Sequence, residues 1–282
     1  MSIKQAKKEY LDKCLENSLV FGTDGTYSYL KFKKEKNKYI ITGVVESVLP
    51  DDVYIDGIFS GIGKGVFMGT KIKSVVCGYG VRFIADSAFE NCRELQSFKT
   101  TDTIRTIGKS SFKGCIKLEQ FECGSKIYMV DHDAFQDCEA LKVINFGRGL
   151  SYLGAGVFSG CKSLTRVQLR YTHIYRLRKE VFKGCISLKR IELPDTCTYI
   201  EDEGFCDCCN LRFIEVGCAL NYLGIAAFYG CNSLEVVQIR DMEMGNSGWS
   251  LLISGKNEAF SELPWLCVTK DGIRWLMERV RE

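Results

Sequence analysis

Hydrophobic residues recur along most of the chain with a period close to 23 residues. A phenylalanine marks each period, and consecutive phenylalanines lie 23 residues apart in five steps and 24 residues apart in one. These phenylalanines are Phe89, Phe112, Phe135, Phe158, Phe182, Phe205 and Phe228. Self-similarity at a fixed period of this length is the sequence signature of a solenoid, in which each repeat forms one coil of a stack.

Other columns of residues keep the same register. A cysteine follows each phenylalanine by three residues, a leucine follows that cysteine by three, and an aliphatic residue precedes the phenylalanine by five. The cysteine column consists of Cys92, Cys115, Cys138, Cys161, Cys185, Cys208 and Cys231. Degenerate periods around Phe67 and Phe260 flank the regular ones, so the pattern predicts about nine coils.

The alternation of polar and apolar residues after each leucine predicts one short strand per coil. Side chains two apart share a face, so Ile144 and Phe146 should point inward while Val143 and Asn145 point outward. Stacked coils then build a parallel sheet with strands ~4.8 Å apart. The outward residues form two rows: Ser97, Gln120, Val143, Arg166, Arg190, Phe213 and Val236, and beside them Lys99, Glu122, Asn145, Gln168, Glu192, Glu215 and Gln238.

The two ends of the chain do not repeat. Residues 1–48 are expected to form an N-terminal cap from a helix and a hairpin with a Lys-Glu-Lys-Asn turn, because the exposed ends of a stack need polar covers. Residues 49–266 form the predicted solenoid, and residues 267–282 form a predicted C-terminal capping helix. Residues 241–255 interrupt the register, so we expect a loop there that carries Trp249.

The repeat motif resembles that of a known family. The segments AFENCRELQSF, VFSGCKSLTRVQL and VFKGCISLKRIELP are similar to the BspA-type leucine-rich repeats of bacteria and some protists, and the resemblance extends over residues 49–266. It implies a right-handed, curved leucine-rich-repeat solenoid with a parallel β-sheet on the concave side and short turns or helical segments between strands. It also implies a role in binding, since family members include surface adhesins and binders of host proteins.

Composition excludes several classes of protein. Apolar residues make up 46% of the 282 residues, which is incompatible with a disordered chain. No apolar run reaches the ~18 residues that a membrane-spanning helix requires. The first twenty residues are charged throughout and lack the apolar stretch of a secretory signal. We therefore expect a cytoplasmic location, or exposure at the cell surface if a leader has been removed.

Fifteen cysteines accompany only two histidines. One cysteine per coil is poor geometry for a tetrahedral zinc site, so the cysteine column is interpreted as a row of small buried side chains. A zinc site remains an alternative where cysteines cluster in sequence, and we otherwise expect no metal or cofactor. That cluster comprises Cys197, Cys206, Cys208, Cys209 and Cys218.

Catalysis has little support in the sequence. His132 and His173 are the two histidines, and no known nucleophile motif surrounds them. The glycine-rich segment 61–65 lacks the first glycine and the Ser or Thr that a phosphate-binding loop requires. The sequence therefore predicts a protein that is not an enzyme.

Charge is unevenly distributed. The net charge is +3, but residues 161–190 contain nine Lys or Arg and one Glu, whereas residues 191–220 contain seven Asp or Glu and one Arg. The basic segment could bind an acidic partner or a nucleic-acid backbone. Alternatively, it is a solvated face whose charge is neutralised by the next coils, which lie within one Debye length.

The leading hypothesis is a non-enzymatic module that binds a protein or a peptide on its concave sheet. Such a sheet would present charged, polar and apolar residues together, as recognition surfaces do. The alternative hypothesis is the binding of nucleic acid or another polyanion by the basic segment 161–190. The candidate partner-binding residues are Arg166, Gln168, Arg190, Glu192, Phe213 and Val236, with Tyr171 and Tyr175 at the rim.

Overall fold

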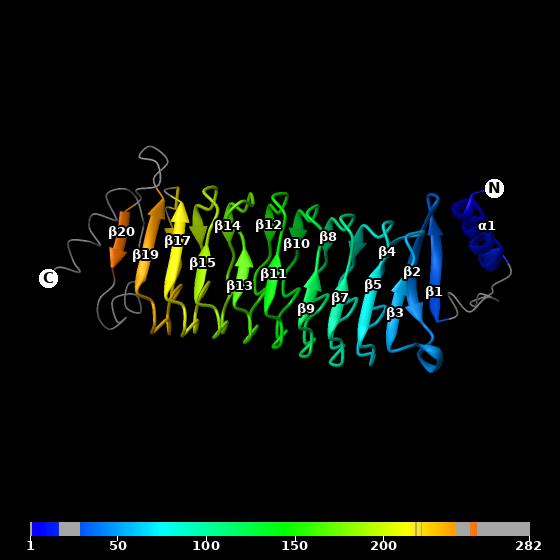
Figure 1. Cartoon of the computed structure of the whole chain (residues 1–282), viewed down its shortest axis with the longest axis horizontal. Helices are drawn as coiled ribbons and strands as arrows, with labels where there is room; N and C mark the ends of the chain where they lie inside the picture. The colour runs from blue at the N-terminus through cyan, green and yellow to red at the C-terminus, as the bar shows by residue number, and fades with distance from the viewer. Residues whose placement is uncertain (1, 17–28, 218, 221, 241–248, 253–282) are drawn as a thin grey trace.

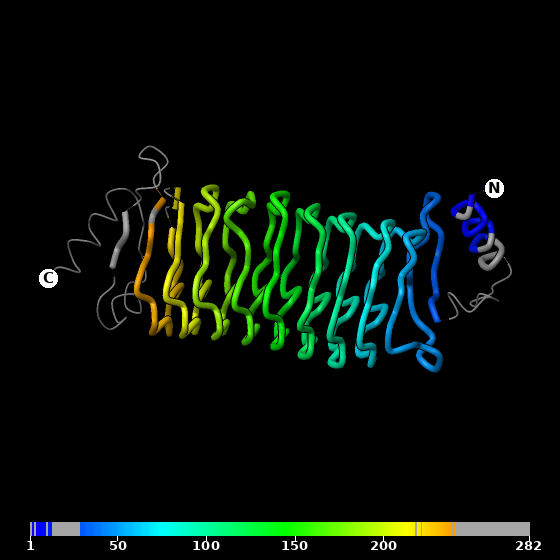
Figure 2. The backbone as a smooth tube through the Cα atoms, in the orientation of Figure 1, coloured from blue at the N-terminus to red at the C-terminus, as the bar shows by residue number. Residues whose placement is uncertain are grey.

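The structure, a computed structural model, is an elongated stack of coils with the N-terminal helix at one end (Figure 1). It describes residues 2–16, 29–217, 219–220, 222–240 and 249–252. Each coil passes through two parallel sheets and a tight turn before it enters the next coil (Figure 2). No helix among the described residues is both long and apolar enough to cross a lipid bilayer.

One sheet, here called the main sheet, contains the strands that the alternation predicted, and it lies toward the viewer in Figure 1. Its strands pair in parallel with the equivalent strand of the next coil, except that β13 and β15 do not pair and that β20 pairs antiparallel with β19. Its strands are β3 (Asp52–Ile55), β5 (Ser74–Cys77), β7 (Ser97–Lys99), β9 (Gln120–Glu122), β11 (Val143–Asn145), β13 (Arg166–Gln168), β15 (Arg190–Glu192), β17 (Phe213–Gly217), β19 (Val236–Arg240) and β20 (Trp249–Leu252).

The other sheet, here called the second sheet, is made mostly of two-residue strands. Its strands are β4 (Phe59–Ile62), β6 (Phe83–Ile84), β8 (Thr106–Ile107), β10 (Met129–Val130), β12 (Tyr152–Leu153), β14 (Arg176–Leu177), β16 (Tyr199–Ile200) and β18 (Tyr222–Leu223). The hairpin of β1 (Leu30–Glu35) and β2 (Lys38–Val44) extends this sheet, since β2 pairs in parallel with β4.

The phenylalanine of each coil is buried between the two sheets, as the periodicity predicted. From Phe67 to Phe228 the rings form one continuous stack, with neighbouring centroids 5.0–5.7 Å apart and ring planes within 12° of parallel. Burial of one such side chain stabilises the fold by ~2–3 kcal/mol. Because no coil can bury its inner face alone, this stack helps to hold neighbouring coils together.

The cysteine column also joins neighbouring coils. The thiol of each of its cysteines donates a hydrogen bond to the carbonyl of the phenylalanine one coil earlier, at sulfur–oxygen distances of 2.9–3.1 Å. Burial raises the pKa of the Cys138 and Cys185 thiols well above the ordinary value, so these groups stay protonated and able to donate.

Both sheets are interrupted at the same coil boundary, which we call the seam. Among the described strands, β13 ends one hydrogen-bonded group of the main sheet and β15 begins the next, while β12 and β14 are separated in the same way in the second sheet. The seam coincides with the single 24-residue period. Its extra residue lies between Leu169 and Leu177.

The N-terminal elements match the expected types. Helix α1 (Ile3–Glu16) buries Leu11, and a single 3-10 turn, η1 (Glu46–Val48), leads into the first coil. The hairpin turn lies one residue later than predicted, because β1 continues to Glu35 and the left-handed backbone falls at Lys36 and Asn37.

Two expectations concern the C-terminal part. The expected loop at Trp249 is wrong in part, because Trp249 begins strand β20 on the edge of the main sheet. The predicted ninth coil around Phe260 and the predicted capping helix 267–282 lie outside the described residues. The division of the chain at residues 48 and 266, and the concavity of the main sheet, stay predictions.

Candidate functional site

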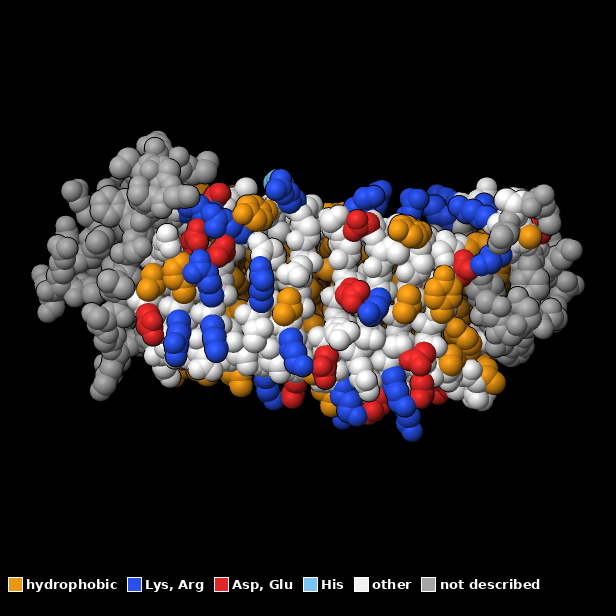
Figure 3. All heavy atoms as spheres, in the orientation of Figure 1, with side chains coloured by type: hydrophobic (Ala, Val, Ile, Leu, Met, Phe, Trp, Pro, Cys, Tyr) orange, Lys and Arg blue, Asp and Glu red, His pale blue; other side chains and the backbone are white. Residues whose placement is uncertain are grey.

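A shallow depression of about 330 Å³ lies on the main sheet at the seam. Four of the predicted site residues line it: Arg166 and Gln168 on β13, and Arg190 and Glu192 on β15. In this region of the sheet, basic side chains lie next to hydrophobic ones (Figure 3). The structure therefore brings half of the predicted residues to one place, where the two groups of strands are not hydrogen-bonded to each other.

Arg190 is fixed on the sheet by three neighbours. Its guanidinium carbon lies 3.8 Å from the centroid of the Phe213 ring on the next strand. Its Nη2 lies 2.9 Å from Glu192 Oε1 and 3.7 Å from the carboxylate of Glu215. A cation over an aromatic face contributes about 0.5–1 kcal/mol at exposed sites, so Arg190 contributes to the packing of this surface as well as to its charge.

Glu215 is the most buried carboxylate of the region, and the sequence analysis did not single it out. Its side chain is 6% exposed and lies among Arg170, Arg190 and Arg240, with Arg240 Nε 2.6 Å from Oε1. Arg240 also pairs with Asp195. Sequence alone placed Glu215 in an outward row, but its burial arises from arginines on three other coils.

Glu192 is held ionised by the same arginines. Partial burial alone raises its pKa, but hydrogen bonds from Arg190 and Arg170 outweigh that effect and keep the pKa of the carboxyl below its ordinary value. This side of the depression is therefore a neutralised ionic cluster.

Three basic residues of the same surface are exposed and unneutralised. Arg166, Lys189 and Arg212 make no side-chain hydrogen bond or ion pair with any residue that the structure describes. Lys189 directly precedes β15, and Arg212 directly precedes β17. These two positions are equivalent in successive coils, since Arg212 N donates to the Lys189 carbonyl oxygen.

The last two sheet residues of the prediction lie beside this group. Phe213 on β17 and Val236 on β19 are half-buried partners in the parallel ladder. Val236 also faces Leu252 in the antiparallel pairing with β20. Together they form an apolar margin next to the cations.

The two tyrosines predicted at the rim are not equivalent. Tyr171 lies in the connection after β13, with the guanidinium groups of Arg148 and Arg170 5.5 and 5.8 Å from its ring centroid. Tyr175 belongs with the second sheet, because its ring packs 5.7 Å from that of Tyr199 on β16. Tyr175 thus lies beside the second sheet, because the connection from β13 carries the chain to that sheet, and its part in partner binding stays a prediction.

Most of the basic segment 161–190 is neutralised by carboxylates of the same or neighbouring coils. Six of its nine cations form ion pairs, and Arg178 instead lies over the Tyr152 ring at 4.9 Å. The pairs are Lys162–Glu139, Arg170–Glu192, Arg176–Glu201, Lys179–Glu203, Lys183–Glu203 and Arg190–Glu192.

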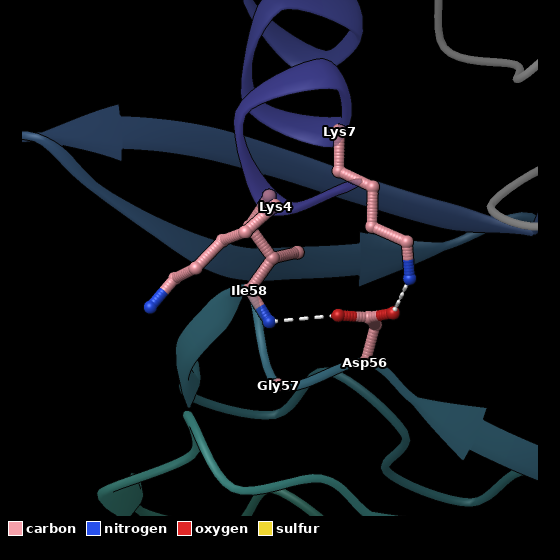
Figure 4. Close-up of a pocket in the computed structure, with 5 residues that line it drawn as sticks. All are labelled: Lys4, Lys7, Asp56, Gly57 and Ile58. Atoms are coloured by element: carbon pink, nitrogen blue, oxygen red, sulfur yellow. Dashed lines mark hydrogen bonds and ion pairs between the residues drawn. The ribbon is translucent and has the colours of Figure 1, made fainter. Parts of the chain in front are cut away.

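A second depression, of about 360 Å³, lies at the N-terminal end between α1 and the first coil (Figure 4). Asp56 accepts a hydrogen bond from the Ile58 backbone N–H at 2.8 Å and forms an ion pair with Lys7. This contact attaches α1 to the solenoid, together with a hydrogen bond of 2.7 Å from the Tyr39 hydroxyl to Asp12.

The cysteines considered for zinc do not converge where they are described. Within the described ranges, no group of three or more His, Cys, Asp or Glu side chains is arranged to hold a metal ion. Cys208 donates to the Phe182 carbonyl, and burial raises the pKa of Cys197 to about 11 and that of Cys206 to about 12. Cys218 lies outside the described residues.

Comparison with protein families assigns the repeat. A family model described as BspA type leucine-rich repeat region matches residues 60–176 and 169–247 with six copies. The chain belongs to the BspA-type leucine-rich repeat family. The predicted solenoid and the predicted resemblance are thereby confirmed, and the family points to a repeat-protein interaction module rather than to a catalytic family.

Solved structures of bacterial leucine-rich repeat proteins share this fold. A Bacteroides ovatus protein is 27% identical over 76% of this chain, with a TM-score of 0.66, and this chain covers 64% of that protein. A T. pallidum leucine-rich repeat protein is 24% identical, with a TM-score of 0.55, over 73% of this chain and 88% of its own. The pneumococcal vaccine antigen PcpA is 17% identical, with a TM-score of 0.54, and the match covers 74% of this chain and 67% of PcpA. No curated protein matches this chain.

Proposed function

We propose that this BspA-type solenoid is a non-enzymatic interaction module that binds a protein or peptide partner on the main sheet at the seam. The observation that carries the proposal is the depression lined by Arg166, Gln168, Arg190 and Glu192, with Phe213 beside it. Fixed ionic groups, an aromatic ring and exposed cations converge there on one face of the main sheet, which is the composition of a recognition surface.

Polyanion binding by the whole basic segment 161–190 is the weaker candidate. Nucleic-acid binding depends on cations that are available to neutralise phosphates. Six of the nine cations already pair with carboxylates of the same chain. The remaining exposed charge lies on the main sheet, where the protein-binding proposal places the partner.

Site-specific photo-crosslinking tests the proposed function. A photoreactive phenylalanine analogue at position 166 replaces a side chain without a described partner, so the fold should be retained. In an extract of the source organism, this variant should form a discrete crosslinked product that mass spectrometry identifies as one protein.

The matched control carries the same analogue at position 128, because Tyr128 is 47% exposed and directly precedes β10 of the second sheet. This variant should not give the product. A product from position 128 and none from position 166 would contradict the assignment of the binding face.

A further inference from the structure

We infer that the partner segment is acidic and extended, and that its carboxylates contact Arg166, Lys189 and Arg212 while an apolar side chain packs on Phe213 and Val236. This inference rests on the proposed function and specifies the chemistry of its partner.

On one side of the surface, the charged side chains are already paired with one another. Arg170, Arg190 and Arg240 share the carboxylates of Glu192 and Glu215, at distances between 2.6 and 3.8 Å. A charged partner group placed there would have to compete with these partly buried pairs, so this side contributes orientation rather than attraction.

The opposite side is positive. Arg166, Lys189 and Arg212 are exposed and lie on three successive coils, without an ion pair to any described residue. Glu235 follows Arg212 in the next coil but forms no ion pair with it among the described residues. Three like charges on successive coils of one surface raise the local concentration of an anionic group.

The geometry suits an extended chain that crosses the strands. Successive coils are ~4.8 Å apart, and alternate side chains of an extended peptide lie ~6.6 Å apart, so flexible Lys and Arg side chains can reach carboxylates at alternate positions. Phe213 and Val236 continue the row beyond Arg190 and offer an apolar contact to a bulky side chain. A polyanion that binds through its phosphates alone would make no contact with this apolar margin.

Fluorescence anisotropy with a labelled synthetic peptide tests the inference. The probe has about ten residues, with Asp or Glu at alternate positions and Leu or Phe near its C-terminal end; its control carries Lys in place of each acidic residue. The full chain should bind the acidic probe and not the basic one. Binding should weaken strongly between about 50 and 300 mM NaCl, because exposed charges are screened by salt.

Two charge-reversal variants localise the site. Lys189→Glu combined with Arg212→Glu should weaken binding at least about tenfold. Lys126→Glu is the control, since Lys126 is exposed in the connection between β9 and β10, two coils before β13, and it should bind the probe like the unaltered chain. Circular dichroism should show the same fold for all variants.

Failure of this inference is distinguishable from failure of the proposed function. If position 166 crosslinks a protein but the acidic peptide does not bind, the binding face stands and the acidic chemistry is wrong. If poly-uridine RNA or heparin binds in a Lys189- and Arg212-dependent manner and the peptide does not, the inference is overturned in favour of a polyanion. Equal binding of the acidic peptide by the double variant and the Lys126→Glu control would also overturn it.

Discussion

The thiol of Cys161 donates a hydrogen bond to the backbone carbonyl of Phe135, one coil earlier, across 3.1 Å. Each of the regular coils repeats this contact, so the cysteine connects neighbouring coils through a carbonyl that also accepts a backbone N–H hydrogen bond within its own turn. Serine would keep a donor on a shorter side chain, and alanine would remove the donor. Substitution of a column cysteine therefore tests the contribution of this hydrogen bond.

Replacement of this thiol should have a measurable cost. Cys161→Ala removes one of the two donors to the Phe135 carbonyl, which keeps its hydrogen bond from the Cys138 N–H, and opens a small cavity, so the free energy of unfolding should fall by about 1–2 kcal/mol. Urea titration followed by circular dichroism measures the change. Cys209→Ala, at a half-buried position outside the column, should change the free energy by less than about 0.5 kcal/mol; equal losses would contradict the role of the hydrogen bond.

Phe158 lies in the middle of the ring stack, between Phe135 and Phe182. Phe158→Ala removes a fully buried ring and its two stacked contacts, so the free energy of unfolding should fall by about 3–5 kcal/mol. Thermal and urea unfolding report the change. The conservative variant Phe158→Leu should lose less than half as much, and equal losses from the two variants would show that ring burial is not the source of the stability.

Ser111 offers a stabilising substitution. Its hydroxyl is buried without a hydrogen-bond partner among the described residues, and the equivalent positions of other coils carry Ala88, Ala134 and Ala227. Ser111→Ala removes an unsatisfied polar group and should raise the free energy of unfolding by about 1 kcal/mol. A decrease in urea titration would mean that the hydroxyl is satisfied in solution.

The ionic cluster around Glu192 makes stability depend on pH. Because the pKa of Glu192 is lower in the folded chain than in the unfolded chain, its stabilising contribution is complete above the unfolded pKa of about 4.3 and is lost as the pH falls through the folded pKa. Glu192→Gln should therefore destabilise the protein most near neutral pH, and the difference from the unaltered chain should shrink below about pH 4.

Urea titrations of both chains across that range measure this difference. Glu235→Gln, at an exposed position outside the cluster, is the matched control and should show no comparable trend. A constant difference between Glu192→Gln and the unaltered chain at every pH would contradict the assignment.

Most of the fold could be predicted from the periodicity, because each sequence repeat forms one coil of the solenoid. The inward positions of Ile144 and Phe146 and the outward positions of Val143 and Asn145 followed from alternation alone. The second sheet escaped prediction because its two-residue strands, such as Tyr152–Leu153, are too short to show alternation.

The site was harder to predict than the fold. Rows of outward residues identified Arg166 and Arg190, but not the burial of Glu215, which depends on Arg240 from a later coil. The packing of Tyr175 against Tyr199 could not be read from the outward rows, because its connection leads from the main sheet to the second sheet. Charge counts along the sequence could not reveal which cations stay unneutralised, because most of the ion pairs join residues about one period apart.

The seam has a consequence for cooperativity. The coils on either side of it keep the contact of Phe158 with Phe182 and the turn hydrogen bonds from Phe158 N and Gly160 N, but β13 and β15 share no ladder. In a linear array, the weakest interface divides the chain into separately melting blocks. A ligand that spans the seam joins those blocks, so its saturation should merge two unfolding transitions into one.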